Sequence, residues 1–141
     1  MHERHTDREL YFREQSQTTS KYVIPFISGV KQVTSSLSVL EIGCGEGGNL
    51  LPFLRAGCAR VTGIDISEYN IGNARRFYSS IPGGESMEFI AANIYDCADV
   101  GKFDLVMMRD VLEHIHDHAR FIGFVKRLLA RDSVLFIAFP P

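Results

Sequence analysis

Short apolar runs alternate with mixed polar and apolar stretches along most of the chain. The runs are continuous rather than alternating, which is typical of strands buried on both faces of a parallel sheet. Glycine or a strand-ending polar residue follows most of them. We therefore predict five strands, at residues 38–43, 60–66, 87–92, 103–108 and 133–139.

The stretches between these strands carry helical patterns and start signals. We predict helices at 49–57, 67–80 and 117–130, capped by Asn49, Ser67 and Asp117 respectively. Since strand and helix alternate with short turns, the crossovers must be right-handed. The predicted fold class is α/β, a doubly wound, mainly parallel, Rossmann-like sheet.

The N-terminal part differs from this alternation, and we predict two regions: a helical cap segment at 1–36 and a ligand-binding domain at 37–141. Residues 1–17 are polar and have a weak helical pattern. The next stretch, 18–32, predicts a helix capped by Thr18 or Thr19 and bent or restarted at Pro25. Its aromatic residues fit either an ordinary core or a lid over a ligand, and the sequence leaves both open: Tyr11, Phe12, Tyr22 and Phe26.

The composition of the chain argues against several classes of protein: nucleic-acid-binding, membrane-spanning, disulfide-rich and zinc-binding proteins. The chain has 141 residues and a formal net charge of −2, which fits one domain and argues against a nucleic-acid surface. It has no apolar run of about 20 residues, so no membrane-spanning helix is predicted. The spacing of Cys44, Cys58 and Cys97 fits neither a disulfide framework nor a zinc site. We interpret them as reduced thiols of a cytoplasmic protein.

A glycine-rich turn, EIGCGEGGN, leaves the first predicted strand and enters a helix. Gly43, Gly45 and Gly47 let the backbone bend tightly and approach a ligand, and the helix start offers unpaired N–H groups. This predicts a nucleotide-like ligand. The spacing Gly43, Gly45, Gly48 also satisfies the dinucleotide fingerprint G-x-G-x-x-G, with Asp65 ending the second strand. A nicotinamide-dependent oxidoreductase therefore remains an alternative.

Glu41, two residues before Gly43, separates these two interpretations. A carboxylate here repels the pyrophosphate of a dinucleotide. S-adenosylmethionine carries an ammonium, a sulfonium and one carboxylate, so the same acid attracts it. The position of Glu41 favours the sulfonium cofactor.

Polar groups at the ends of the other strands complete a predicted binding edge. Asp65 can accept hydrogen bonds from both ribose hydroxyls. Asn93 can bond the adenine edge and the N–H of Ile94 a ring nitrogen, although an asparagine here often only caps a turn. The backbone carbonyls of Met108 and Arg109 can hold the ammonium. Their neighbours along the chain complete the predicted set: Cys44, Asn49, Ile66 and Tyr95.

With these motifs the sequence resembles a class I S-adenosylmethionine-dependent methyltransferase. The segments concerned are EIGCGEG (41–47), GIDIS (63–67), NIYD (93–96) and FDLVMMRDVLEHI (103–115), within residues 38–139. The resemblance implies S-adenosylmethionine as cofactor, strand order 3-2-1-4-5, and methyl transfer, for which we expect a small-molecule acceptor. Asn93 stands where the family more usually has aspartate.

The resemblance also implies a final antiparallel hairpin, and this sequence stops before it. We therefore expect a truncated chain whose fifth strand is an unpaired edge, and a non-catalytic module that binds S-adenosylmethionine stays an alternative. No N-P-P-[YF] follows the strand at 103–108, which disfavours amino-methylation of nucleic-acid bases. The sequence does not reveal the oligomeric state.

The segment DVLEHIHDH (110–118) allows other interpretations. Asp110 and Glu113 have the spacing of a capping box. His114 and His118 are four residues apart, but Asp117 is predicted to cap a helix between them, so we predict no metal site. His114 is a candidate general base, and otherwise a surface histidine.

Overall fold

Five parallel strands form a single sheet in the order β3-β2-β1-β4-β5. The structure is a computed structural model that describes the backbone of residues 2–139 and the side chains of residues 7–139. The predicted α/β class and strand order are confirmed. The strands are β1 (Ser38–Ile42), β2 (Arg60–Asp65), β3 (Glu88–Ala91), β4 (Phe103–Arg109) and β5 (Leu129–Ala138).

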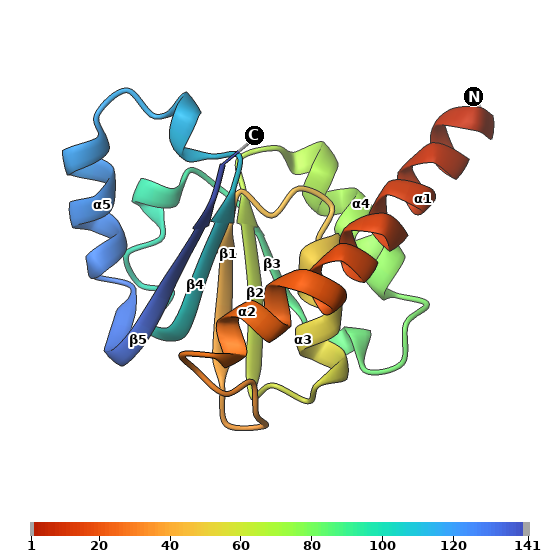
Figure 1. The fold of residues 1–141 in the computed structure, drawn as a ribbon. Helices are drawn as coiled ribbons and strands as arrows, with labels where there is room; N and C mark the ends of the chain where they lie inside the picture. The colour runs from red at the N-terminus through yellow and green to blue at the C-terminus, as the bar shows by residue number, and fades with distance from the viewer. Residues whose placement is uncertain (1, 140–141) are drawn as a thin grey trace.

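Helices cover both faces of the sheet, as the doubly wound prediction requires (Figure 1). One face packs against four of them: α1 (His2–Thr18), α2 (Ile24–Ser28), α3 (Leu51–Arg55) and α4 (Glu68–Tyr78). The other face packs against α5 (His118–Lys126). Among the described residues, no helix is both long and apolar enough to cross a bilayer.

The two faces have separate hydrophobic cores, and each central strand contributes to both. Val39 of β1 and Met107 of β4 belong to the core under α1–α4, whereas Leu40 and Val106 belong to the core under α5. Successive strand side chains point to opposite faces. The central strands must therefore be apolar at nearly every position, which is why their sequences read as continuous runs.

Two of the predicted helix starts are confirmed by hydrogen bonds. The Ser67 side chain accepts from the backbone N–H of Asn70 (3.1 Å), and Asp117 accepts from that of Arg120 (3.0 Å). The prediction that the last helix reaches residue 130 is wrong. It ends at Lys126, because the chain joins the sheet at Leu128, whose carbonyl accepts from Phe103 N–H (2.8 Å).

The N-terminal segment is helical from His2 onward, which its polar sequence only weakly indicated. The helix α1 continues through a π-helical turn, Thr19–Val23, into α2. Thr18 has helical dihedral angles and no capping hydrogen bond, so the prediction of a cap at Thr18 or Thr19 is wrong. Pro25 lies in the first turn of α2, where the predicted restart occurs.

The aromatic residues of this segment divide between core and surface. Phe12 is buried, with its ring 5.1 Å from the ring of Phe77. Tyr11, Tyr22 and Phe26 are each more than half exposed. Phe12 therefore anchors α1 on the domain.

Within the described residues, β5 pairs with β4 and with no other strand. The expectation of an unpaired apolar edge is thus met, and the residues of its apolar stretch, 134–137, are only partly buried.

Candidate functional site

The turn after β1 requires glycine at three positions. Gly43, Gly45 and Gly47 have φ values of 71°, 57° and 86°, in the left-handed region that other residues rarely adopt. A Cβ on Gly43 would lie 2.6 Å from Cγ2 of Val111, and one on Gly47 would lie 3.0 Å from the ring of Phe89. The turn is therefore shaped both by backbone conformation and by close packing.

Asp65, the last residue of β2, holds this turn in place. Its Oδ2 accepts from the backbone N–H of Gly45 (2.8 Å), and its Oδ1 accepts from that of Ser67 (2.9 Å). A carboxylate has about four acceptor positions, so both oxygens retain capacity for a ligand's hydroxyl groups.

Glu41 lies at the centre of a buried polar network beneath the turn. Its Oε2 accepts from Nδ2 of Asn49 (3.0 Å). The Asn49 Oδ1 in turn accepts from Oγ1 of Thr19 (2.8 Å) and from the Arg109 guanidinium (3.2 Å). The prediction of Asn49 as a helix cap is wrong, because it lies inside a 3₁₀ turn, Gly48–Leu50, with its side chain drawn toward Glu41.

The environment of Glu41 suits a positively charged ligand. Its other oxygen, Oε1, is buried and accepts no hydrogen bond from the described residues. Burial raises the pKa of Glu41 to about 8, and the charge of Asp65 adds to the rise, while the Asn49 hydrogen bond and Arg109 oppose it. A cation placed beside Oε1 would stabilise the ionised carboxylate.

Two adjoining cavities flank the turn and share Gly43. The first, which we call the acidic cavity, has a volume of about 510 Å³ and is lined by Tyr11, Glu14, Gln15, Thr18, Glu41, Gly43, Cys44, Gly45, Glu46, Asn49, Asn70, Arg109 and Asp110. The second, the apolar cavity, has a volume of about 260 Å³ and is lined by Ile42, Gly43, Ile64, Asp65, Ile66, Ala92, Asn93, Ile94, Tyr95, Val111, Ile115 and Phe121.

Most of the predicted cofactor residues lie in these two cavities. The acidic cavity contains Glu41, Gly43, Cys44, Gly45, Asn49 and Arg109, and the apolar cavity contains Gly43, Asp65, Ile66, Asn93, Ile94 and Tyr95. Gly47 and Met108 line neither cavity. The Met108 side chain is fully buried in the core under α5.

In the apolar cavity, Asn93 has the turn-capping role that the sequence left open. Its Oδ1 accepts from Tyr95 N–H (3.0 Å) at the start of a 3₁₀ turn, Ile94–Asp96. The Asn93 amide NH₂ makes no hydrogen bond to the described residues and is available to a ligand. Ile66 is 72% exposed and gives the cavity an apolar surface on which a flat ring can rest.

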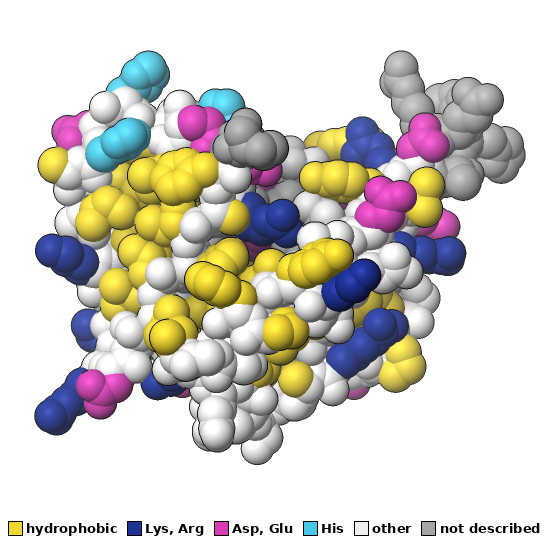
Figure 2. Space-filling view, in the orientation of Figure 1, with side chains coloured by type: hydrophobic (Ala, Val, Ile, Leu, Met, Phe, Trp, Pro, Cys, Tyr) yellow, Lys and Arg dark blue, Asp and Glu magenta, His cyan; other side chains and the backbone are white. Residues whose placement is uncertain are grey.

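The histidine-rich segment stays on the surface, at the top of the view in Figure 2. The side chain of His114 is 78% exposed, 3.7 Å from Glu113, and lines neither cavity. In the part of the chain that the structure describes, no group of three or more His, Cys, Asp or Glu residues is arranged to hold a metal ion.

The capping box predicted at Asp110 and Glu113 is wrong. Asp110 has φ of 56°, whereas an N-cap residue needs an extended backbone. The following 3₁₀ turn, Leu112–His114, starts after Val111 and has no side-chain cap. Asp110 instead lines the acidic cavity.

Sequence reasoning left Tyr11 open as a residue over the ligand but missed its neighbours on α1. Tyr11, Gln15 and Thr18 line the acidic cavity together with Glu14. Their spacing of four and three residues places them on one helical face, which is the pattern that could have identified them.

The family of the chain is shown by its sequence. A family model described as "Methyltransferase domain" matches residues 40–137. The ubiquinone biosynthesis O-methyltransferase of Rhizobium leguminosarum bv. trifolii is 37% identical over 103 residues, which are 72% of this chain and 40% of that protein. The chain thus spans about 40% of the length of the curated relatives it matches.

Solved structures agree with this assignment. The magnesium protoporphyrin IX methyltransferase of Synechocystis PCC 6803 with bound SAM is 27% identical, with a TM-score of 0.66, over 90% of this chain and 60% of that one. PKMT2 from Rickettsia typhi in complex with AdoHcy shares the fold, with a TM-score of 0.71 at 22% identity over 83% of this chain and 24% of that one. From the residues matched, the chain belongs to the methyltransferase domain family.

Proposed function

We propose that this domain binds S-adenosylmethionine across the acidic and apolar cavities and supplies its methyl group to a small-molecule acceptor. The observation that carries the proposal is Glu41, a buried acid that lines the acidic cavity and whose Oε1 accepts no hydrogen bond from the described residues.

The charges in the acidic cavity support a cationic ligand. Four acidic side chains, Glu14, Glu41, Glu46 and Asp110, and one basic side chain, Arg109, line it. Glu46 is paired with Arg8 (3.4 Å), so a pyrophosphate would meet repulsion from Glu14 and Asp110, whereas an ammonium and a sulfonium would be attracted. Arg109, the basic residue in this lining, is the proposed partner of the single carboxylate of the cofactor.

The apolar cavity suits the adenosine half of the cofactor. Asp65 lies at its edge with acceptor capacity for the ribose hydroxyls. Ile66 offers an apolar surface for the adenine ring, and the Asn93 amide and the Ile94 N–H are the groups proposed for its polar edge. The methionine half then extends past Gly43 into the acidic cavity.

The reaction would be an in-line displacement, in which the sulfur–methyl bond breaks as the bond to the acceptor forms. The curated relatives are named O-methyltransferases, so a hydroxyl oxygen is the first acceptor chemistry to test. The protein then has to align the acceptor and exclude water, and a base is needed only to remove the hydroxyl proton. His114, the candidate base, is 78% exposed and lines neither cavity.

Calorimetry with S-adenosylhomocysteine and NAD⁺ side by side tests the cofactor assignment. We expect S-adenosylhomocysteine to bind and NAD⁺ neither to bind nor to compete, and the reverse result would refute the proposal. Transfer of labelled methyl from S-adenosylmethionine to small hydroxylated acceptors tests catalysis separately. Binding without transfer would identify the domain as a cofactor-binding module.

A further inference from the structure

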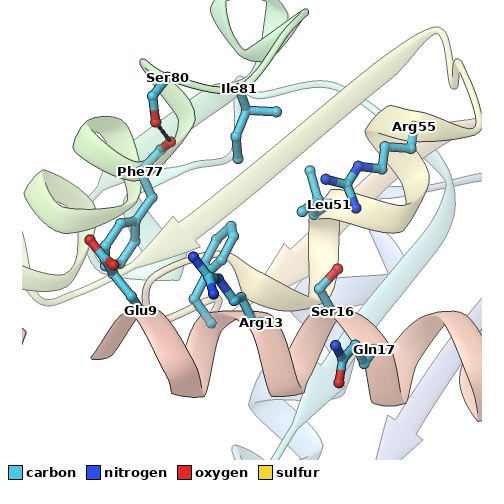
Figure 3. Close-up of a pocket in the computed structure, with 10 residues that line it drawn as sticks. Glu9, Arg13, Ser16, Gln17, Leu51, Arg55, Phe77, Ser80 and Ile81 are labelled. Atoms are coloured by element: carbon cyan, nitrogen blue, oxygen red, sulfur yellow. Dashed lines mark hydrogen bonds between the residues drawn. The ribbon is translucent and has the colours of Figure 1, made fainter. Parts of the chain in front are cut away.

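A third cavity of about 430 Å³ lies between α1 and the pair α3–α4 (Figure 3). Residues on the side of α1 that faces away from the acidic cavity form one wall, and the opposite wall comes from α3 and from the end of α4. Its volume falls within the range of about 300–1,000 Å³ that is typical of small-molecule sites.

Two arginines from different helices meet at this cavity. Arg13 comes from α1 and Arg55 from α3, and Figure 3 shows both guanidinium groups directed toward the space between the helices. Among the described residues, neither forms an ion pair or a hydrogen bond with a carboxylate. Glu9, at the end of the cavity near Phe77, is the acidic residue in its lining. The charge of the cavity therefore favours an anion.

The floor of the cavity is apolar and partly aromatic. The rings of Phe12 and Phe77 lie 5.1 Å apart, and Leu51, which is 4% exposed, extends the same surface. A flat hydrocarbon body placed on this floor would leave water while its charged group faced the arginines.

We propose that this cavity is a second ligand site, for an organic anion with a flat apolar body, such as an aromatic carboxylate. The apolar floor holds the body, and Arg13 and Arg55 hold the carboxylate. Arginine suits this role because its planar donors match a carboxylate.

The second site is separate from the acidic cavity because α1 lies between them, and it shares no lining residue with the apolar cavity. Glu9, Phe12, Arg13, Ser16 and Gln17 face the second site, and none of them lines the acidic cavity. An anion bound there and S-adenosylhomocysteine can therefore occupy the protein together.

Titration with 2-naphthoate and its neutral analogue 2-naphthalenemethanol, followed by calorimetry and amide NMR shifts, tests the proposal. We expect the carboxylate to bind roughly tenfold more tightly than the alcohol and to shift amides of α1, α3 and the end of α4. Saturating S-adenosylhomocysteine should leave its affinity unchanged. Arg13→Gln and Arg55→Gln should each weaken binding roughly two- to fivefold, the range for exposed charge pairs.

Arg131→Gln is the matched control, because Arg131 is an exposed arginine of β5 outside the cavity lining. It should leave the affinity for 2-naphthoate unchanged. Equal affinities for the acid and the alcohol, an equal loss in the control, or displacement by S-adenosylhomocysteine would each overturn the proposal. Both test positions are exposed, so the variants should fold.

Discussion

Binding of the cofactor should release a proton from Glu41. Burial places the pKa of this carboxyl at about 8, so in the free protein at pH 7 it holds about 0.9 of a proton. The ammonium of the bound cofactor would lie beside its unpaired Oε1 and favour the ionised form. Binding and deprotonation are then linked.

The size of the effect follows from the pKa. If Glu41 is fully ionised in the complex, the apparent affinity depends on the fraction that is already ionised in the free protein. That fraction rises from roughly one in eleven at pH 7 to one in two at pH 8. S-adenosylhomocysteine should therefore bind about fivefold more tightly at pH 8 than at pH 7.

Calorimetry at pH 7 in buffers of different ionisation enthalpy measures the released proton directly. Glu41→Gln keeps the acceptor for Asn49 and removes the titration, so proton release and the pH dependence should both disappear. Glu14→Gln, at an exposed position in the same cavity, should leave both intact. Wild-type binding without proton release, or an unchanged pH dependence in Glu41→Gln, would refute the reasoning.

Three further results are expected. Asp65→Ala should weaken S-adenosylhomocysteine binding tenfold or more by calorimetry, because it removes the carboxylate that also accepts a hydrogen bond from the backbone N–H of Gly45. The control variant Asp96→Ala should leave the affinity unchanged. Gly47→Ala should lower the free energy of unfolding, measured in urea, by at least about 1 kcal/mol, because residue 47 has a φ of 86°. Gly72→Ala should instead raise it by about 1 kcal/mol, because a Cβ there meets open space and alanine favours the helix α4 more than glycine does. Because the folded pKa of Glu41 lies above its ordinary value of 4.5, the free energy of unfolding should fall as pH rises from 5 to 8, and Glu41→Gln should remove that fall.

The sheet and the glycine turn were predictable because local chemistry determines them. A strand covered on both faces must be apolar at successive positions, and a turn with positive φ must use glycine. Asp65 was predictable for a similar reason, since the end of β2 places it beside the turn. None of these inferences required knowledge of contacts between distant residues.

The role of Asn49 could not be predicted in this way. Its side chain is oriented by Thr19, Glu41 and Arg109, and two of these are 30 and 60 residues away in sequence. A polar residue at a predicted helix start is read as a cap by local rules. Here the buried carboxylate of Glu41 accepts a hydrogen bond from the Asn49 side chain, so this side chain does not cap the helix.

The end of the last helix was mispredicted for a comparable reason. Leu128 and Leu129 continue the helical spacing of apolar residues, so the local pattern extends the helix. Leu128 nevertheless accepts a hydrogen bond from Phe103, and Leu129 pairs with the same residue at the start of the β4–β5 ladder. Pairing with β4 therefore sets where α5 ends, and the local sequence pattern does not show this pairing.

Gly48 shows why a glycine spacing alone did not identify the ligand. It completes the dinucleotide fingerprint, yet a Cβ there would lie 2.7 Å from the Phe12 carbonyl oxygen and 2.7 Å from Oε1 of Gln15. The glycine is therefore required by the packing of α1 on the turn, whatever ligand the turn binds. Because α1 brings Tyr11 and Glu14 to the acidic cavity through that contact, Gly48 shapes the cofactor site indirectly. Gly48 thus completes the fingerprint for a steric reason, and the acid at Glu41 is what distinguishes the two interpretations.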